Sequence, residues 1–191
     1  MCRVCGEKEE TVAHLASVCS GLAGKQYLKR HDKVGLRVHW ELCGKYGVER
    51  SAKWYEHVPA SVVRNKDGMV ELYWDRRVET VSELKHNRPD VVVIDRRERK
   101  WTFVDFSVPL DSNVAFKEDQ KITTYEPLAR EISKSYHVKT EIIPIIIGAL
   151  GTVPKRLGGY LDKLGIPDII GSMQVAALLG TQRILKNVLS L

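Results

Sequence analysis

The sequence lacks the features of a membrane or secreted protein. None of its apolar runs reaches the ~18–20 residues that a membrane-spanning helix needs. The N-terminus has no apolar segment of the kind found in secretory signal peptides. Internal repeats and low-complexity tracts are also absent. We therefore expect a globular protein that makes no use of a membrane.

Cysteine is scarce, and its context excludes a disulfide framework. The 191 residues contain four cysteines, which without a secretion signal are expected to be reduced thiols or metal ligands. Apolar residues make up 43% and charged residues 28% of the chain, which is ordinary for a globular protein with one well-buried core. A formal charge of +6 favours a polyanionic partner only mildly, because many proteins without such a partner are equally basic.

Cysteine and histidine gather near the N-terminus. Cys2, Cys5, His14 and Cys19 form the pattern C-x2-C-x8-H-x4-C, whose soft or borderline ligands suit tetrahedral zinc. A segment this short cannot build a core, so zinc would supply its folding energy. The pattern predicts a structural zinc knuckle over 1–22. Cys43 lies outside the pattern and is expected to be a small core residue.

The rest of the chain, 24–191, alternates between helical and strand patterns. A long basic amphipathic helix is predicted over 24–46. Strands are predicted over 69–74, 91–95, 101–108 and within 139–151, the second and third joined as a hairpin. Helices are predicted from 114 onward, over 155–164 and over 173–189. This order predicts an α/β domain with a mixed four-stranded sheet flanked by helices.

Two prolines lie inside predicted elements. Pro127 should kink or split the helix that begins near 114, because proline removes a helical hydrogen bond. Pro144 predicts an edge position or a bulge for the last strand, because proline cannot donate to a neighbouring strand.

Two acids flank the predicted hairpin. Asp90 precedes its first strand and Asp105 lies inside its second. Pairing Asp95 with Trp101 would place Asp90 opposite Phe106, so strict alternation would point the two carboxylates to opposite faces. A bulge or a four-residue tip would bring them to one face. A buried carboxylate is costly unless a cation compensates it, and that cation is either a structural partner or a catalytic metal.

The two acids match the layout of PD-(D/E)xK nucleases. Their carboxylates would hold Mg²⁺, which polarises a phosphate and lowers the pKa of the attacking water, and the carbonyl of Phe106 is a further candidate ligand. The usual lysine position, two residues after the second acid, holds Ser107. Lys121 begins a helical stripe with Tyr125 and Ile132 that should face the sheet. Lys121 is therefore either a displaced catalytic lysine or a surface lysine.

Basic side chains mark two candidate phosphate-binding surfaces. One follows the first long helix and the other lies at the hairpin tip, and a further lysine precedes Lys121 by one turn. Each could contact a nucleic-acid backbone, and the alternative is a solvated surface. The candidates are Lys25, Lys29, Arg30, Lys33, Arg37, Arg96, Arg97 and Lys117.

Five blocks of sequence support a more specific interpretation. They are "RHDKVGLRVHWEL", "NRPDVVVID", "VDFSVPLD", "KEDQKITTYEPL" and "IIIGALG". With the cysteine/histidine pattern they make nearly the whole chain resemble the C-terminal region of non-LTR retrotransposon polyproteins, where a CCHC zinc knuckle precedes a restriction-like PD-(D/E)xK endonuclease. In that family the catalytic lysine lies on the helix after the acidic strand, with a tyrosine close behind. The resemblance implies a restriction-endonuclease-like core with Asp90, Asp105, Lys121 and Tyr125 as catalytic residues.

The resemblance also implies a biological role. It implies a DNA endonuclease with catalytic Mg²⁺ and structural Zn²⁺, which nicks target DNA so that the 3′-hydroxyl primes reverse transcription. The implied partners are DNA, RNA as a further candidate, and the reverse transcriptase domain of the parent polyprotein, and the implied location is the nucleus. Two alternatives stay open: an inactive nucleic-acid-binding remnant of such an element, and a structural zinc-stabilised domain that docks a polymerase.

Overall fold

The computed structural model describes residues 1–190, and four of its strands begin within one residue of the predicted positions. These are β2 (Val70–Trp74), β3 (Val91–Asp95), β4 (Lys100–Ser107) and β5 (Lys139–Ile146). A further strand, β1 (Val62–Arg64), pairs with β2 but has only three residues, too few for alternation to be visible in the sequence. The mixed sheet therefore has five strands, and the prediction of four is wrong.

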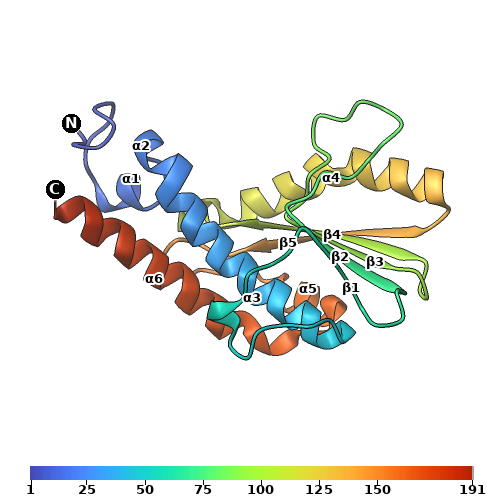
Figure 1. Cartoon of the computed structure of the whole chain (residues 1–191). Helices are drawn as coiled ribbons and strands as arrows, with labels where there is room; N and C mark the ends of the chain where they lie inside the picture. The colour runs from blue at the N-terminus through green and yellow to red at the C-terminus, as the bar shows by residue number, and fades with distance from the viewer. Residues whose placement is uncertain (191) are drawn as a thin grey trace.

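The strands lie in the order β1-β2-β3-β4-β5 across the sheet (Figure 1). The first four pair antiparallel, and β5 runs parallel to β4. The long helix α4 (Val114–Tyr136) makes the crossover that a parallel pair requires. Because β5 is an edge strand, Pro144 leaves no ladder hydrogen bond unmade on its outer side, which confirms the prediction of an edge position.

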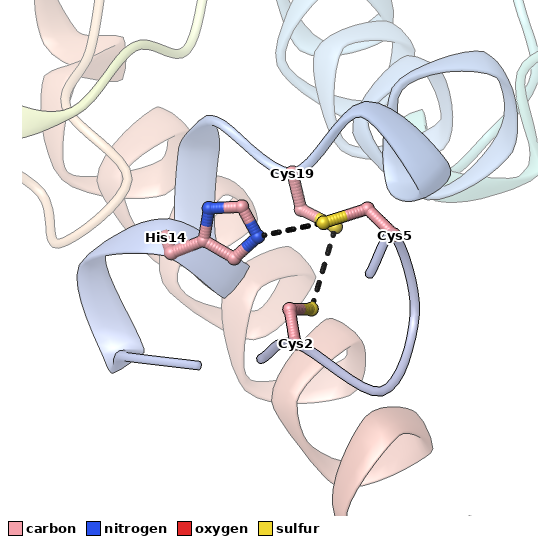
Figure 2. A group of neighbouring side chains, drawn as sticks. All are labelled: Cys2, Cys5, His14 and Cys19. Carbon is pink, nitrogen blue, oxygen red and sulfur yellow. Dashed lines mark hydrogen bonds between the residues drawn. The ribbon is translucent and has the colours of Figure 1, made fainter. Parts of the chain in front are cut away.

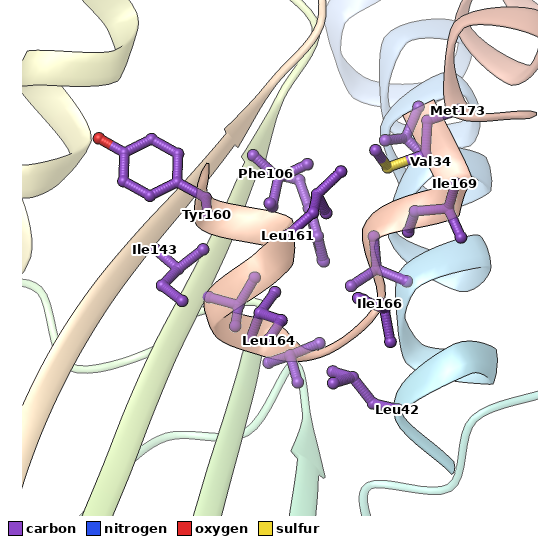
Figure 3. Packing of buried hydrophobic residues seen from close by; sticks show 14 of the residues in the cluster. Val34, Leu42, Phe106, Ile143, Tyr160, Leu161, Leu164, Ile166, Ile169 and Met173 are labelled. Atoms are coloured by element: carbon purple, nitrogen blue, oxygen red, sulfur yellow. The ribbon is translucent and has the colours of Figure 1, made fainter. Parts of the chain in front are cut away.

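Helices cover both faces of the sheet. One face packs against α3 (Leu28–Tyr46), α5 (Leu157–Leu164) and α6 (Ile170–Leu189), and α4 covers the other. Figure 3 shows Leu161 and Leu164 of α5 between the sheet and α3. Among the described residues, no helix combines the length and apolarity that a membrane span requires. The shorter helical segments are α1 (Val12–Ser17), α2 (Ser20–Leu22), η1 (Ala23–Tyr27), η2 (Trp54–Glu56), η3 (Asp111–Asn113) and η4 (Pro167–Ile169).

The sequence of strand β3 shows little alternation between apolar and polar residues, and the packing of the strand explains why. Val91 and Val93 pack in the cluster with α3 and α6, whereas Val92 and Ile94 pack in the cluster with α4. Both faces of β3 are therefore buried, and such a strand is a continuous apolar run. On the α3 side the helix lies close to the sheet at Gly35, where an added Cβ would be 2.8 Å from the ring of Phe106.

Pro127 lies inside α4, which continues as one helix to Tyr136. Of the two predicted outcomes, a kink or a split, the split is therefore wrong. Leu128 and Ile132, which follow the proline, are both buried against the sheet. Their packing offsets the hydrogen bond that proline removes, because burial of such side chains contributes about 1.5–3 kcal/mol each.

The tip of the β3–β4 hairpin is one residue shorter than predicted. Asp95 pairs with Lys100, so the tip has the four residues 96–99, and the predicted pairing of Asp95 with Trp101 is wrong. Asp95 itself closes the tip: its Oδ1 accepts hydrogen bonds from the backbone N–H groups of Arg97 and Glu98, at 3.0 and 3.1 Å. Such a side-chain cap favours a tight turn because it satisfies two backbone donors locally.

This tip sets the positions of the two acids. Val91 pairs with Val104, so one further step along the ladder sets Asp90 opposite Asp105. Directly opposed residues of an antiparallel pair point to the same face. Of the two arrangements that would bring the acids together, a bulge or a four-residue tip, the structure has the second.

Candidate active site and metal centre

The four residues of the cysteine/histidine pattern come together at the N-terminus (Figure 2). The Cys2 and Cys19 sulfurs are 3.9 Å apart, and the Cys5 sulfur is 3.3 Å from Nε2 of His14. A tetrahedral zinc ion holds its ligands about 3.6 Å apart for a nitrogen and a sulfur and about 3.8 Å apart for two sulfurs. The cluster can therefore hold a metal ion, and its donors and spacings suit zinc.

Short local contacts build this cluster. Gly6 has a φ of +71°, a value that glycine adopts without strain, and it closes the turn that presents both Cys2 and Cys5. His14 lies in α1, where its N–H donates to the hydroxyl of the N-cap Thr11 at 3.1 Å. Backbone hydrogen bonding, chiefly from Glu7, lowers the pKa of Cys5 to about 6, which favours the thiolate form that binds metal.

The knuckle does not stand apart from the rest of the chain. Cys2, Cys19 and Leu22 pack in one apolar cluster with Ile184 and Val188 near the end of α6. Zinc in the knuckle would therefore also support the C-terminal helix.

The second acid, Asp105, is almost fully buried in β4. Its Oδ1 accepts a hydrogen bond of 2.6 Å from the hydroxyl of Tyr125, and its Oδ2 forms an ion pair with Nζ of Lys121. Both partners come from α4, one turn apart. The sequence prediction that Lys121 begins the sheet-facing stripe of this helix is confirmed, and this lysine is not a purely surface residue.

The first acid, Asp90, lies just before β3 and is held from two sides. Its Oδ2 accepts from the backbone N–H of Phe106 at 2.6 Å and lies 3.2 Å from Nε2 of His31 on α3. The other ring nitrogen of His31 is 3.1 Å from Asp32. Burial disfavours the imidazolium, but the hydrogen bonds and charges of the two aspartates outweigh burial and raise the pKa of His31 to about 9. His31 is therefore a cationic partner of Asp90 at neutral pH.

The groups around Asp105 have opposing effects on its pKa. Burial raises the pKa of Asp105, the nearby charge of Asp90 raises it further, and Lys121 and Tyr125 act in the opposite direction. Burial and the charge of Asp105 raise the pKa of Tyr125 well above its usual range. Tyr125 is therefore a hydrogen-bond donor to Asp105 and not a proton acceptor near neutral pH.

A third carboxylate near the centre was not predicted. Asp75 follows β2 with a φ of +45°, and its N–H donates to the carbonyl of Asp90 at 2.7 Å. Its carboxylate pairs with Arg88 at 2.7 Å. The pattern of β2 gives no sign that the chain turns back toward Asp90 at this point, so the sequence holds no signal for this neighbour.

Arg30 is part of the fold and is not available to a nucleic acid. Only 2% of it is exposed. Its guanidinium donates to the carbonyl of Ala16 at 2.6 Å, to the hydroxyl of Thr181 at 2.7 Å and to the carbonyl of Val108 at 3.2 Å. The prediction that Arg30 contacts phosphate is therefore wrong, and its role is to join α3 to α1, α6 and the end of β4.

We expect Arg30→Ala to lower the free energy of unfolding by roughly 3 kcal/mol, because two buried acceptors and one partly buried acceptor lose their donor. Urea unfolding of the full chain measures this loss. The exposed neighbour Lys29 is the matched control, and Lys29→Ala should change stability by no more than ~0.5 kcal/mol. Equal stability of the two variants would contradict the assigned role.

The other basic candidates reach the surface, although the side chain of Arg37 is mostly buried. Three arginines are each paired with an acid of the protein: Arg37 with Glu41, Arg96 with Glu71, and Arg97 with Asp67. Lys25 and Lys29 on the first long helical stretch are exposed, and Lys33 and Lys117 are partly exposed. These lysines are the better candidates for phosphate contact, because protein carboxylates already neutralise part of the charge of the arginines.

Polar side chains from α3, β4, α4 and the start of β3 thus meet at one end of the sheet. The sequence predicted Asp90, Asp105, Lys121 and Tyr125 as members of one site, and these residues are neighbours. No protein-family model matches the chain, and no curated protein matches it either.

Proposed function

We propose that the chain is a magnesium-dependent DNA endonuclease with a restriction-endonuclease-like core. The observation that carries this proposal is the placement of Asp90 opposite Asp105 by a four-residue hairpin tip, with Lys121 paired to the buried acid. The element order α3-β1-β2-β3-β4-α4-β5 supports the same core, since it places an acid before one central strand, an acid on the next and a lysine on the following helix.

The donor set of this centre fits a hard divalent cation. Asp90 and Asp105 would hold Mg²⁺ through carboxylate oxygens, the ligands that this ion prefers. Within residues 1–190 both hydrogen bonds of the Asp90 side chain use Oδ2, so Oδ1 is left to accept a further partner. The N–H and C=O of one strand residue point to the same side, so the carbonyl of Phe106 faces Asp90 and is a suitable third ligand. When bound, the ion would activate water and polarise the scissile phosphate.

The protein side chains perform separate tasks around that ion. Lys121 supplies a positive charge at the acid pair, where it offsets negative charge that develops on the phosphate. Tyr125 fixes the orientation of Asp105 through its hydroxyl hydrogen bond. His31 and the N–H of Phe106 fix Asp90 in the same way. The fixed positions reduce the reorganisation that the site would otherwise need during the reaction.

The proposed context follows from the resemblance to non-LTR retrotransposon polyproteins. The nick would leave a 3′-hydroxyl that primes reverse transcription in the nucleus, with the reverse transcriptase domain of the parent polyprotein as partner. The knuckle over 1–22 and the surface lysines would help to hold DNA or RNA. The test is whether plasmid nicked by the chain in magnesium is extended directly by a DNA polymerase, because extension requires a free 3′-hydroxyl.

A further inference from the structure

A second group of metal-ligating side chains lies far from the knuckle in sequence. His39 and Cys43 are four residues apart on α3, so both point to the same side of the helix. His57 follows η2 and folds back onto that side. Nδ1 of His39 is 2.9 Å from Nε2 of His57 and 3.6 Å from the sulfur of Cys43. All three side chains are buried.

These distances fit a shared metal ion. Two nitrogen ligands of a tetrahedral zinc ion are about 3.3 Å apart, and a nitrogen and a sulfur are about 3.6 Å apart. The three donor atoms of the cluster all lie within 4.8 Å of one another. In the knuckle, where four ligands surround one ion position, the nitrogen-to-sulfur distance is 3.3 Å, the sulfur-to-sulfur distance is 3.9 Å, and the donor atoms also lie within 4.8 Å of one another. The second cluster is therefore as tightly gathered as the first.

We propose that His39, Cys43 and His57 form a second zinc site, which fastens the segment between α3 and β1 to α3. That segment, 47–61, contains only the three-residue helix η2 as regular structure. The segment also contacts α3 through the indole N–H of Trp40, which donates to the carbonyl of Ser51 at 2.8 Å. A buried metal cross-link would hold this segment far more firmly, since structural zinc contributes directly to folding free energy. Cys43 is then a ligand and not only the small core residue that the sequence suggested.

The alternative occupant of the site is a proton shared between the two imidazoles. One ring would donate to the other, and the thiol of Cys43 would keep its proton because burial raises its pKa to about 11. Zinc binding would release the thiol proton and shift the shared proton to the other nitrogen of its own ring. The two occupants predict different metal contents for the same chain.

The test is the zinc content of the full chain. The protein is purified without chelator, incubated with excess zinc, freed of unbound metal by gel filtration and analysed for zinc and protein. The wild-type chain should hold about two zinc ions. Cys43→Ser and His57→Gln should each keep about one, and Cys5→Ser, which breaks only the knuckle, should also keep about one. About one ion in the wild-type chain would overturn the proposal, and so would two ions in both Cys43→Ser and His57→Gln.

Cobalt substitution identifies which site each ion occupies. The knuckle offers three thiolates and the second site only one, so thiolate-to-cobalt charge-transfer absorption should be weaker for the second site. Cys43→Ser should lose the weaker component and leave the strong one unchanged. If Cys5→Ser, with the knuckle broken, binds no cobalt, the second site does not exist. None of these readouts depends on nuclease activity, so the proposal stands or falls independently of the proposed function.

Discussion

Lys121→Ala should cleave DNA roughly 10²-fold more slowly than the parent chain, or slower still, and bind DNA about equally well. The lysine is paired with a buried acid at the centre, and loss of one preorganised donor to developing charge typically has an effect of this size. One phosphate contact contributes only a small part of the total electrostatic binding. Single-turnover cleavage of a labelled duplex measures the cleavage rate, and a filter-binding titration measures the DNA affinity.

Lys117→Ala is the matched control for Lys121. Lys117 lies one turn earlier on α4, is partly exposed, and donates to Gln120 at 2.7 Å. Its replacement should lower the rate far less. Ser107 is two residues after Asp105 and thus on the same face of β4, so Ser107→Lys should restore part of the rate in the Lys121→Ala background. Unchanged cleavage by Lys121→Ala, with loss of activity in Asp90→Ala, would show a real site with a wrongly assigned lysine.

Cys19→Ser should remove zinc from the knuckle and unfold the N-terminal segment together with the end of α6. Cys19 is fully buried and packs in the cluster with Ile184 and Val188. Apparent zinc-binding free energies of structural sites are about 10–16 kcal/mol, far more than the hydrogen bond from Arg30 to the carbonyl of Ala16 can contribute to holding this segment. Hydrogen exchange should show lost protection over 1–22 and in the last turns of α6, with the sheet unchanged.

Ser20→Ala is the control for this effect, because Ser20 is adjacent to Cys19 but only donates an exposed hydrogen bond to Glu7 at 3.0 Å. It should keep zinc and native protection. Protection of α6 that survives in Cys19→Ser would show that the helix does not depend on the knuckle.

Local patterns predicted four of the five strands and the cysteine/histidine cluster, because apolar runs and ligand spacings are properties of adjacent residues. The hairpin register was not predictable in the same way. A tip of four or five residues fits the sequence equally well, and only the cap by Asp95 and the packing of both faces decide between them.

Long-range contacts account for the other differences between the predicted and the observed roles of residues. Arg30 looked like a surface cation on a basic helix, but its partners Ala16, Val108 and Thr181 come from three distant segments. The spacing of His39 and Cys43 was visible in the sequence, whereas His57 joins them only through the return of the segment after α3. Such contacts depend on tertiary packing, which no local pattern encodes.

The most direct measurement of the central claim is nicking of supercoiled plasmid by the purified chain and by Asp105→Asn, with and without magnesium. Asp105→Asn keeps the shape of the side chain but removes the charge that would hold the ion. The account predicts nicking by the parent chain that requires magnesium, and none above background by Asp105→Asn. Salt-dependent DNA binding without nicking by the parent chain, or equal nicking by both proteins, would contradict it.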